Sequence, residues 1–250
     1  MNVIRGVVLG TAALVCAGAV LSSAASPASA AVVTVLNPSF ESPTTGTYTT
    51  LPTPVTDWGN STNAEGGVFN ALFVGYTFGT SGFSFGAPDG TQGLYAQSDT
   101  FGPNVWFQDV GVVVPGATYD LSLYVGQNPG GSGLSPADIA LVTGFSNGIG
   151  PSYSAFASSH GAVTPSSGQW LLTTLTGIAP KTATGDLWIL LGTDFAGAGN
   201  GVGQADFDNV SLRETPASAV PEPATWGMML IGFGLVGLQL RRRTVKEVTC

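Results

Sequence analysis

Apolar and polar residues alternate with a period of two through the middle of the chain, which is the spacing of β-strands with one buried face. The alternation is clearest from Thr118 to Val125, where Tyr119, Leu121, Leu123 and Val125 fall on one face. Similar runs occur at residues 32–36, 110–114, 170–175, 186–191 and 205–212. Clusters of Gly, Pro, Ser and Asn separate these runs, as turns between strands require. The pattern predicts an all-β ectodomain, an antiparallel β-sandwich, over residues 31–213.

The N-terminal segment follows a different pattern. Asn2 to Arg5 is short and positive, and Gly6 to Leu21 is an apolar run of mostly small residues. Ala28-Ser29-Ala30 then matches the small-x-small pattern that precedes a signal peptidase cut. The apolar run is short for a membrane span. We therefore expect a signal peptide over residues 1–30, cleavage between Ala30 and Ala31, and export of the mature chain.

A second apolar run, from Ala224 to Leu240, lies close to the C-terminus. Trp226 is an interfacial aromatic residue, and Arg241, Arg242 and Arg243 form a positive flank of the kind that stays in the cytoplasm. The run is near the lower length limit for a hydrocarbon core of ~30 Å. Its glycines would make a poor helix in water. The pattern predicts a single transmembrane helix with the arginines as the membrane stop, preceded by a linker at 214–219 and followed by a cytoplasmic tail at 244–250.

The order of these C-terminal elements resembles a known sorting signal. Pro221-Glu222-Pro223, the apolar helix and the Arg cluster, together residues 220–243, resemble the PEP-CTERM signal of exopolysaccharide-producing Gram-negative bacteria, which is also labelled an ice-binding protein C-terminal domain. The resemblance implies that an exosortase, a membrane transpeptidase-like enzyme, reads and cuts the Pro-Glu-Pro element. It therefore implies an intermediate anchored in the inner membrane and a final place at the cell surface or in the extracellular matrix. The family usually stops soon after the arginines, whereas this chain continues to Cys250.

Charge and cysteine content narrow the function classes. The formal net charge is −8, and between residues 31 and 215 only Lys181 and Arg213 oppose thirteen carboxylates. Such a surface repels phosphate backbones, so we expect no nucleic-acid partner. The only cysteines, Cys16 and Cys250, lie outside the predicted sandwich, which therefore has no disulfide, thiolate metal cluster or cysteine nucleophile. His160 is the single histidine, and one histidine is too few for a His-based zinc site. The sequence also has no Gly-x-Ser-x-Gly nucleophile elbow, which argues against a Ser-His-Asp hydrolase.

A further resemblance concerns the sandwich itself. Residues 36–41 (Leu-Asn-Pro-Ser-Phe-Glu), 56–58 (Thr-Asp-Trp) and 207–212 (Phe-Asp-Asn-Val-Ser-Leu) resemble the frame of carbohydrate-binding, galactose-binding-like jelly rolls. The resemblance implies a jelly-roll-like sandwich. It also implies that Glu41 and Asp208 hold a structural Ca²⁺, a cation that prefers six to eight oxygen ligands. The alternative is that both carboxylates cap turns or accept ordinary hydrogen bonds.

Aromatic residues supply the candidates for ligand contact, because exposed rings stack on sugar faces while buried rings fill cores. Trp58 and Trp170 are expected in the core. Trp106 lies beside polar residues and is the ring we expect to be partly exposed, with Tyr76 as a second candidate. Tyr76 belongs to an aromatic-rich segment that either folds over the sandwich or forms an exposed patch.

These observations predict an exported, surface-sorted and non-enzymatic protein that binds, or forms part of, the extracellular polysaccharide matrix. The alternative is a structural or adhesive protein that self-associates and has no sugar site. A glycoside hydrolase would need a spaced pair of carboxylates in a cleft, and the sequence selects no such pair.

Overall fold

The computed structural model describes residues 29–47, 49, 54–60, 66–70, 86–98, 104–127, 136–146, 152–193, 203–217 and 223–244. The chain divides into two compact units. One unit, Ala28–Ser218, holds the described strands, and the other joins Met1–Pro27 to Ala219–Cys250 and holds the described helix. Most of the predicted signal peptide, residues 1–28, lies outside the described residues.

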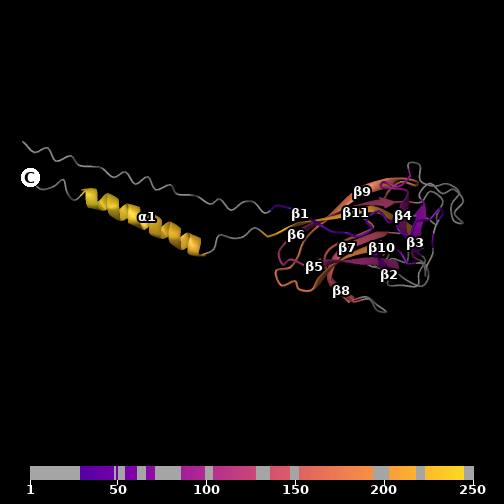
Figure 1. Ribbon diagram of the computed structural model, residues 1–250, viewed down its shortest axis with the longest axis horizontal. Coiled ribbons are helices and arrows are strands. Elements are labelled where there is room, and N and C mark those ends of the chain that lie inside the picture. The colour runs from indigo at the N-terminus through magenta and orange to yellow at the C-terminus, as the bar shows by residue number, and fades with distance from the viewer. Residues whose placement is uncertain are drawn as a thin grey trace, which may run out of the picture. The chain divides into compact units, whose positions relative to one another are not determined.

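The strands form two antiparallel sheets (Figure 1). The strands are β1 (Ala31–Val33), β2 (Gly59–Asn60), β3 (Gly66–Asn70), β4 (Gln92–Ser98), β5 (Asn104–Val112), β6 (Thr118–Gly126), β7 (Ala137–Ser146), β8 (Ser152–His160), β9 (Trp170–Ile178), β10 (Asp186–Thr193) and β11 (Gly203–Thr215). The first sheet has the order β3-β4-β11-β6-β9, with β1 also paired to β11, and the second has the order β2-β5-β10-β7-β8. The predicted all-β antiparallel sandwich is confirmed.

Strand β6 shows how the sequence alternation builds the core. Tyr119, Leu121, Leu123 and Val125 are all fully buried, as predicted, and they belong to the main hydrophobic cluster between the sheets. The intervening residues of β6 are half-buried, because they face outward. The outward residues of β6 are therefore available to line a surface site on the first sheet.

The second sheet also carries apolar residues on its outer face. Val105, Ala140, Val142 and Leu190 are fully buried in a cluster separate from the main core. They are covered by half-buried aromatic rings, namely those of Phe107, Phe145, Tyr153 and Trp188. The rings of Phe107 and Phe145 lie 4.8 Å apart at their centroids. This outer layer is fixed by its own side chains and gives the second sheet two apolar faces.

The first and last described strands of the sandwich pair with each other in the first sheet. β1 pairs with β11 in a register that places Ala31 opposite Glu214 and Val33 opposite Leu212. β11 also pairs with β4 and with β6, so it is a central strand. The last strand of the domain is therefore the one that joins most of the first sheet.

The C-terminal unit contains the helix α1 (Pro223–Thr244), which confirms the predicted helix. Its large apolar side chains, including Leu230, Ile231 and Phe233, are exposed. The described part of the chain contains no helix with the combined length and apolar character of a membrane span.

Candidate functional site

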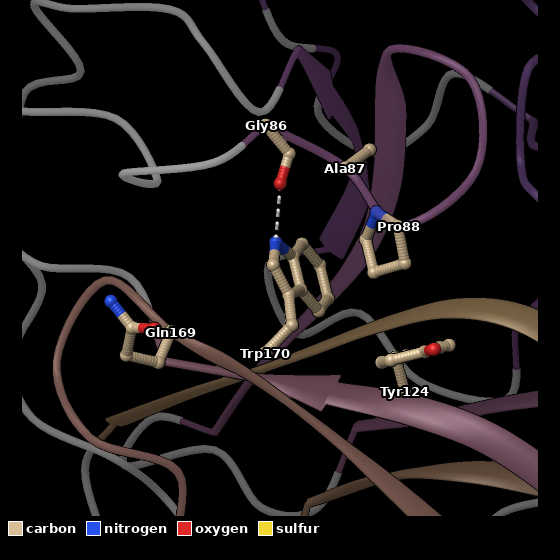
Figure 2. Close-up of a pocket in the computed structure, with 6 residues that line it drawn as sticks. All are labelled: Gly86, Ala87, Pro88, Tyr124, Gln169 and Trp170. Atoms are coloured by element: carbon tan, nitrogen blue, oxygen red, sulfur yellow. Dashed lines mark hydrogen bonds between the residues drawn. The ribbon is translucent and has the colours of Figure 1, made fainter.

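A small open pocket lies on the first sheet (Figure 2). Its volume is about 220 Å³. Tyr124 comes from β6, Trp170 from the start of β9 and Gln169 from the turn before it. The other wall is the segment Gly86-Ala87-Pro88, which precedes β4. Figure 2 shows the Trp170 ring between Gln169 on one side and Pro88 and Tyr124 on the other.

Backbone pairing and one hydrogen bond fix these groups. The β6–β9 register places Gly126 opposite Trp170, and the outward alternation of β6 brings Tyr124 to the same face. The indole N–H of Trp170 donates to the carbonyl oxygen of Gly86 at 2.7 Å. The backbone N–H of Gln127 donates to the carbonyl oxygen of Gln169 at 3.2 Å, which ties the turn before β9 to the end of β6. The ring of Trp170 is thus held half-buried, with its orientation set before any ligand arrives.

A buried carboxylate lies in the same row of the sheet. Tyr95 on β4, Asp206 on β11, Gly126 on β6 and Trp170 on β9 are successive partners across four strands. Asp206 is fully buried, and its Oδ1 accepts a hydrogen bond from the Gln204 side-chain amide at 2.6 Å. Because strands are ~4.8 Å apart, Asp206 and Trp170 stand about 10 Å apart with only a glycine between them.

The described lining of the pocket is uncharged. It offers an indole, a phenol, a pyrrolidine ring and one side-chain amide, and it contains no carboxylate, histidine or cysteine. Flat rings with one or two polar groups are suited to stacking against a ring and orienting it by hydrogen bonds. General acid or base catalysis needs a titrating group within hydrogen-bond reach, and the phenol of Tyr124 is the one such side chain in the described lining.

The ring predicted to be exposed is buried. Trp106 is only 1% exposed, and its indole N–H donates to the carbonyl oxygen of Tyr95 at 3.1 Å. The polar neighbours that favoured exposure, Asn104 and Gln108, are themselves buried and hydrogen-bonded. Trp170 was expected in the core and instead lines the pocket, whereas Trp58 is in the core as expected. Tyr76 lies outside the described residues.

The two carboxylates predicted at the ends of the domain meet at one turn. Glu41 Oε1 accepts hydrogen bonds from the backbone N–H groups of Thr91 and Gln92, each at 2.7 Å. Asp208 Oδ2 accepts from the backbone N–H of Asp89 at 2.9 Å. The turn at residues 89–92 therefore links the first motif of the domain to the last. This arrangement contains the turn-capping hydrogen bonds that were the alternative to a metal.

Burial makes Asp208 an unusual carboxyl group. The pKa of Asp208 is raised to about 8. Burial is the largest cause, the backbone N–H groups of Asp89 and Asn209 lower the pKa, and the charges of Asp89 and Glu41 raise it. Three carboxylates thus lie near one another with hard oxygen atoms of the kind Ca²⁺ prefers. No group of three or more His, Cys, Asp or Glu side chains among the described residues has the arrangement of a metal site. A Ca²⁺ held by Glu41 and Asp208 would therefore need carbonyl or water oxygens as well.

The single histidine forms a separate pair on the second sheet. His160 ends β8, and its Nδ1 lies 2.5 Å from Oδ1 of Asp138, which is fully buried. The pair belongs to the second sheet, whereas the Trp170 pocket lies on the first. It therefore adds no acid or base to the pocket.

The sorting motif is described only in part. Pro221 and Glu222 lie outside the described residues, and Pro223 is the first residue of α1, a position that suits the fixed φ of proline. Arg241, Arg242 and Arg243 lie in the last turn of α1, where positive charge is favourable.

Two families match the sequence in separate parts of the chain. Residues 31–213 match the family described as HpiC1 cyclase, and residues 219–243 match the PEP-CTERM protein-sorting motif. The second match confirms the resemblance drawn from Pro-Glu-Pro, the apolar run and the arginines. No curated protein matches the sequence.

Solved structures with a similar fold include cyclases. The Stig cyclase Fisc from Fischerella sp. TAU, in complex with (3Z)-3-(1-methyl-2-pyrrolidinylidene)-3H-indole, is 21% identical with a TM-score of 0.57, and the match covers 76% of this chain and 100% of that one. A cyclase from the same organism in complex with 4-(1H-indol-3-yl)butan-2-one has the same identity and coverage and a TM-score of 0.56. The CBM22-1 xylan-binding domain of Paenibacillus barcinonensis Xyn10C is 18% identical with a TM-score of 0.44, over 76% of this chain and 98% of that one. At these identities the likeness to the cyclases is one of fold.

Proposed function

Because the chain belongs to the HpiC1 cyclase family and carries a PEP-CTERM sorting motif that implies export to the cell surface, we propose that it is a surface-sorted protein that binds an uncharged ring-shaped ligand in the Trp170 pocket. The uncharged aromatic lining of the pocket carries this proposal. A volume of about 220 Å³ suits one ring unit at a time, below the size of a pocket that encloses a drug-sized ligand.

The proposed ligand is a sugar unit of an extracellular polysaccharide, and the proposed role is non-enzymatic. A sugar has an apolar face for Trp170 and hydroxyl groups for Gln169 and nearby backbone groups. Outward polar side chains continue from the pocket along β6 and β9, with Ser122 opposite Thr174 in the register. A polysaccharide chain could lie along this row. The location of the protein at the cell surface would bring the row into contact with the matrix.

We also propose that the chain is processed at both of its ends. A signal peptidase would remove residues 1–30, the C-terminal segment would hold an intermediate at the inner membrane, and an exosortase would cut near Pro221-Glu222-Pro223. The sandwich, once cut free, would then remain at the cell surface or in the matrix of a Gram-negative bacterium.

We further propose that Ca²⁺ is structural here. Glu41 and Asp208 would hold it against the turn at residues 89–92, together with carbonyl or water oxygens. Since Asp89 directly follows the pocket wall at Gly86–Pro88, the ion would also fix that wall. Its chemistry would be to offset the negative charge of Glu41 and Asp208, and it would take no part in a reaction.

A second candidate function is catalysis of a ring-forming reaction, which family membership favours. Structures of two members of the fold contain indole compounds, and an indole would fit an aromatic pocket as well as a sugar would. In that case Asp206, the carboxylate in register with Trp170, would be the proton donor or acceptor for a ligand that reached past Gly126 to it.

One titration separates these candidates. The full-length chain in a mild detergent is titrated by calorimetry with oligosaccharides from extracellular polysaccharides and, separately, with 4-(1H-indol-3-yl)butan-2-one. Trp170→Ala is expected to weaken binding of the true ligand by about 30-fold or more, since a central aromatic contact is worth ~2 kcal/mol or more. Trp188→Ala removes a half-buried ring from the other sheet and is expected to leave affinity unchanged. Sugar binding supports the first candidate, indole binding supports the second, and binding that survives Trp170→Ala would refute both.

A further inference from the structure

Strand β9 is a long edge strand of the first sheet. Its nine residues, Trp170–Ile178, pair one-to-one with β6 without a bulge, and β6 is the only described strand that pairs with it. The strand lies at the rim of the sandwich in Figure 1. It contains no charged residue and no proline. Natural edge strands usually carry a charge, a proline, a bulge or a cover, because a bare edge pairs with other chains.

The other described edges differ from β9 in length or regularity. β3 has five residues, β1 has three and β2 has two. β8 is as long as β9, but its register with β7 shifts at two places. Of the edge strands in the described part of the sandwich, β9 therefore offers the longest regular row of backbone groups.

The exposed side chains of β9 are apolar or hydroxylic. Leu171, Leu172 and Ile178 are 47%, 54% and 65% exposed, and Thr174 and Thr176 are also exposed. Ile178, Thr174 and Thr176 are of residue types with high β-propensity. Exposure of three large aliphatic side chains on one strand has a solvation cost that a second strand would remove.

We propose that β9 pairs with β9 of a second copy of this chain, antiparallel and centred on Thr174, so that the first sheets of the two copies join into one. The contact is made by the backbone edge of β9, which adjoins the ligand pocket at Trp170, and the proposal does not depend on what the pocket binds. It also differs from self-association through loops, because main-chain hydrogen bonds along β9 provide the contact.

The sequence of β9 is complementary to itself in this register. The opposed pairs across the two-fold axis are Trp170 with Ile178, Leu171 with Gly177, Leu172 with Thr176, Thr173 with Leu175, and Thr174 with Thr174. Three of these pairs set a leucine against a smaller residue. The pairs of Trp170 with Ile178 and of Thr174 with Thr174 are of kinds that stabilise antiparallel strands. Ile178 of the second copy would lie beside Trp170, next to the pocket.

Charge favours β9 over other surfaces for contact between two copies. The region between residues 31 and 215 has thirteen acidic and two basic side chains, so most faces of two copies repel each other. Across β9 no charge is brought against its own copy. The nearest carboxylate, Asp120 on β6, is bound by the Thr176 hydroxyl at 2.6 Å and stays one strand back from the edge.

Charge variants at the two-fold axis test the pairing. Thr174→Lys and Thr174→Glu each place two like charges directly opposite one another, which is destabilising. Sedimentation of the full-length chain in a mild detergent is expected to show a concentration-dependent dimer for the unaltered protein and at least a tenfold weaker dimer for either variant. An equimolar mixture of the two variants is expected to recover the dimer, because opposite charges then meet. Ser211→Lys is the matched control, since Ser211 is exposed on β11, two strands from the edge.

Cysteine cross-linking gives an independent readout. With Cys16 and Cys250 replaced by Ser, Thr174→Cys is expected to form a disulfide-linked dimer under mild oxidation, because directly opposed Cβ atoms lie about 4.5–5.5 Å apart. Ser211→Cys is expected to stay monomeric on a non-reducing gel. A wild-type chain that remains monomeric at all concentrations, a dimer unaffected by both charge variants, or equal cross-linking of the two cysteine variants would each overturn the proposal.

Discussion

At the scale of single residues, Asp208 shows how burial changes a carboxyl group. Burial is the largest cause of its raised pKa of about 8, and Asp89 and Glu41 add to it. Its ordinary pKa is 3.8. The folded protein therefore binds more protons than the unfolded chain between these two values, and the free energy of unfolding falls as the pH rises through that window. A bound Ca²⁺ would oppose this fall, because it stabilises the ionised carboxylate.

Thermal unfolding at several pH values tests whether the pKa of Asp208 is raised in the folded protein. In EGTA, the melting temperature is expected to fall by several degrees from pH 5 to pH 8, as Asp208 loses its proton. Millimolar CaCl₂ is expected to restore much of the loss at pH 8 and to have little effect at pH 5. Asp208→Asn is expected to flatten both dependences. A melting temperature that rises from pH 5 to pH 8 in EGTA would contradict the raised pKa, and an absent calcium effect at pH 8 would exclude the ion.

The tryptophans show what the sequence could and could not predict about the site. The Asp-Trp element correctly predicted a buried Trp58, because its flanking residues resemble a fold in which that ring is core. Trp106 and Trp170 were assigned the wrong way round. The polar neighbours of Trp106 satisfy their hydrogen bonds inside the protein, and Trp170 is exposed by its place on an edge strand. Neither fact is local in sequence, since both depend on which strands pair.

At the scale of elements, β10 is held tightly between β5 and β7. Gly192 lies opposite Val105 on one side and Asp138 on the other. A Cβ atom at Gly192 would overlap the backbone carbonyl oxygen of Asn104, which cannot move as a flexible side chain would. The close approach of β5 to β10 therefore depends on glycine at this position.

Gly192→Ala is expected to destabilise the protein by roughly 2–4 kcal/mol, since overpacking against backbone forces the strands apart. Gly46→Ala is the matched control, because a Cβ atom there meets nothing within 4 Å. Chemical denaturation followed by tryptophan fluorescence measures both. Equal stability of the two variants would show that β5 and β10 can separate without cost.

Period-two alternation predicted some strands better than others. It located β6 and its buried face, because one side of that strand faces solvent. It was less informative for β10, where both faces are apolar. It could not give the pairing of β11 with β4 and β6 or the register that aligns Asp206 with Trp170, because these contacts join residues far apart in the chain.

At the scale of the whole molecule, we expect the sorting motif to act independently of the sandwich. Replacing Pro221, Glu222 and Pro223 by Ala is expected to leave the fold of the sandwich unchanged and to stop release at the cell surface, because the sequence read by the exosortase is lost. Mass spectrometry of the surface form is expected to find a C-terminus near residues 221–223 in the wild type. A surface form that still ends at Cys250 would contradict the proposed processing.

The central position of β11 has a consequence for how the chain is made. β11 is the last strand to leave the ribosome, yet β1, β4 and β6 all pair with it. Until residue 215 has emerged, the first sheet lacks the strand that joins its parts, and its long-range contacts cannot form cooperatively. The growing polypeptide therefore lacks a complete first sheet until late in its synthesis. An incompletely folded chain is what a protein-conducting channel accepts.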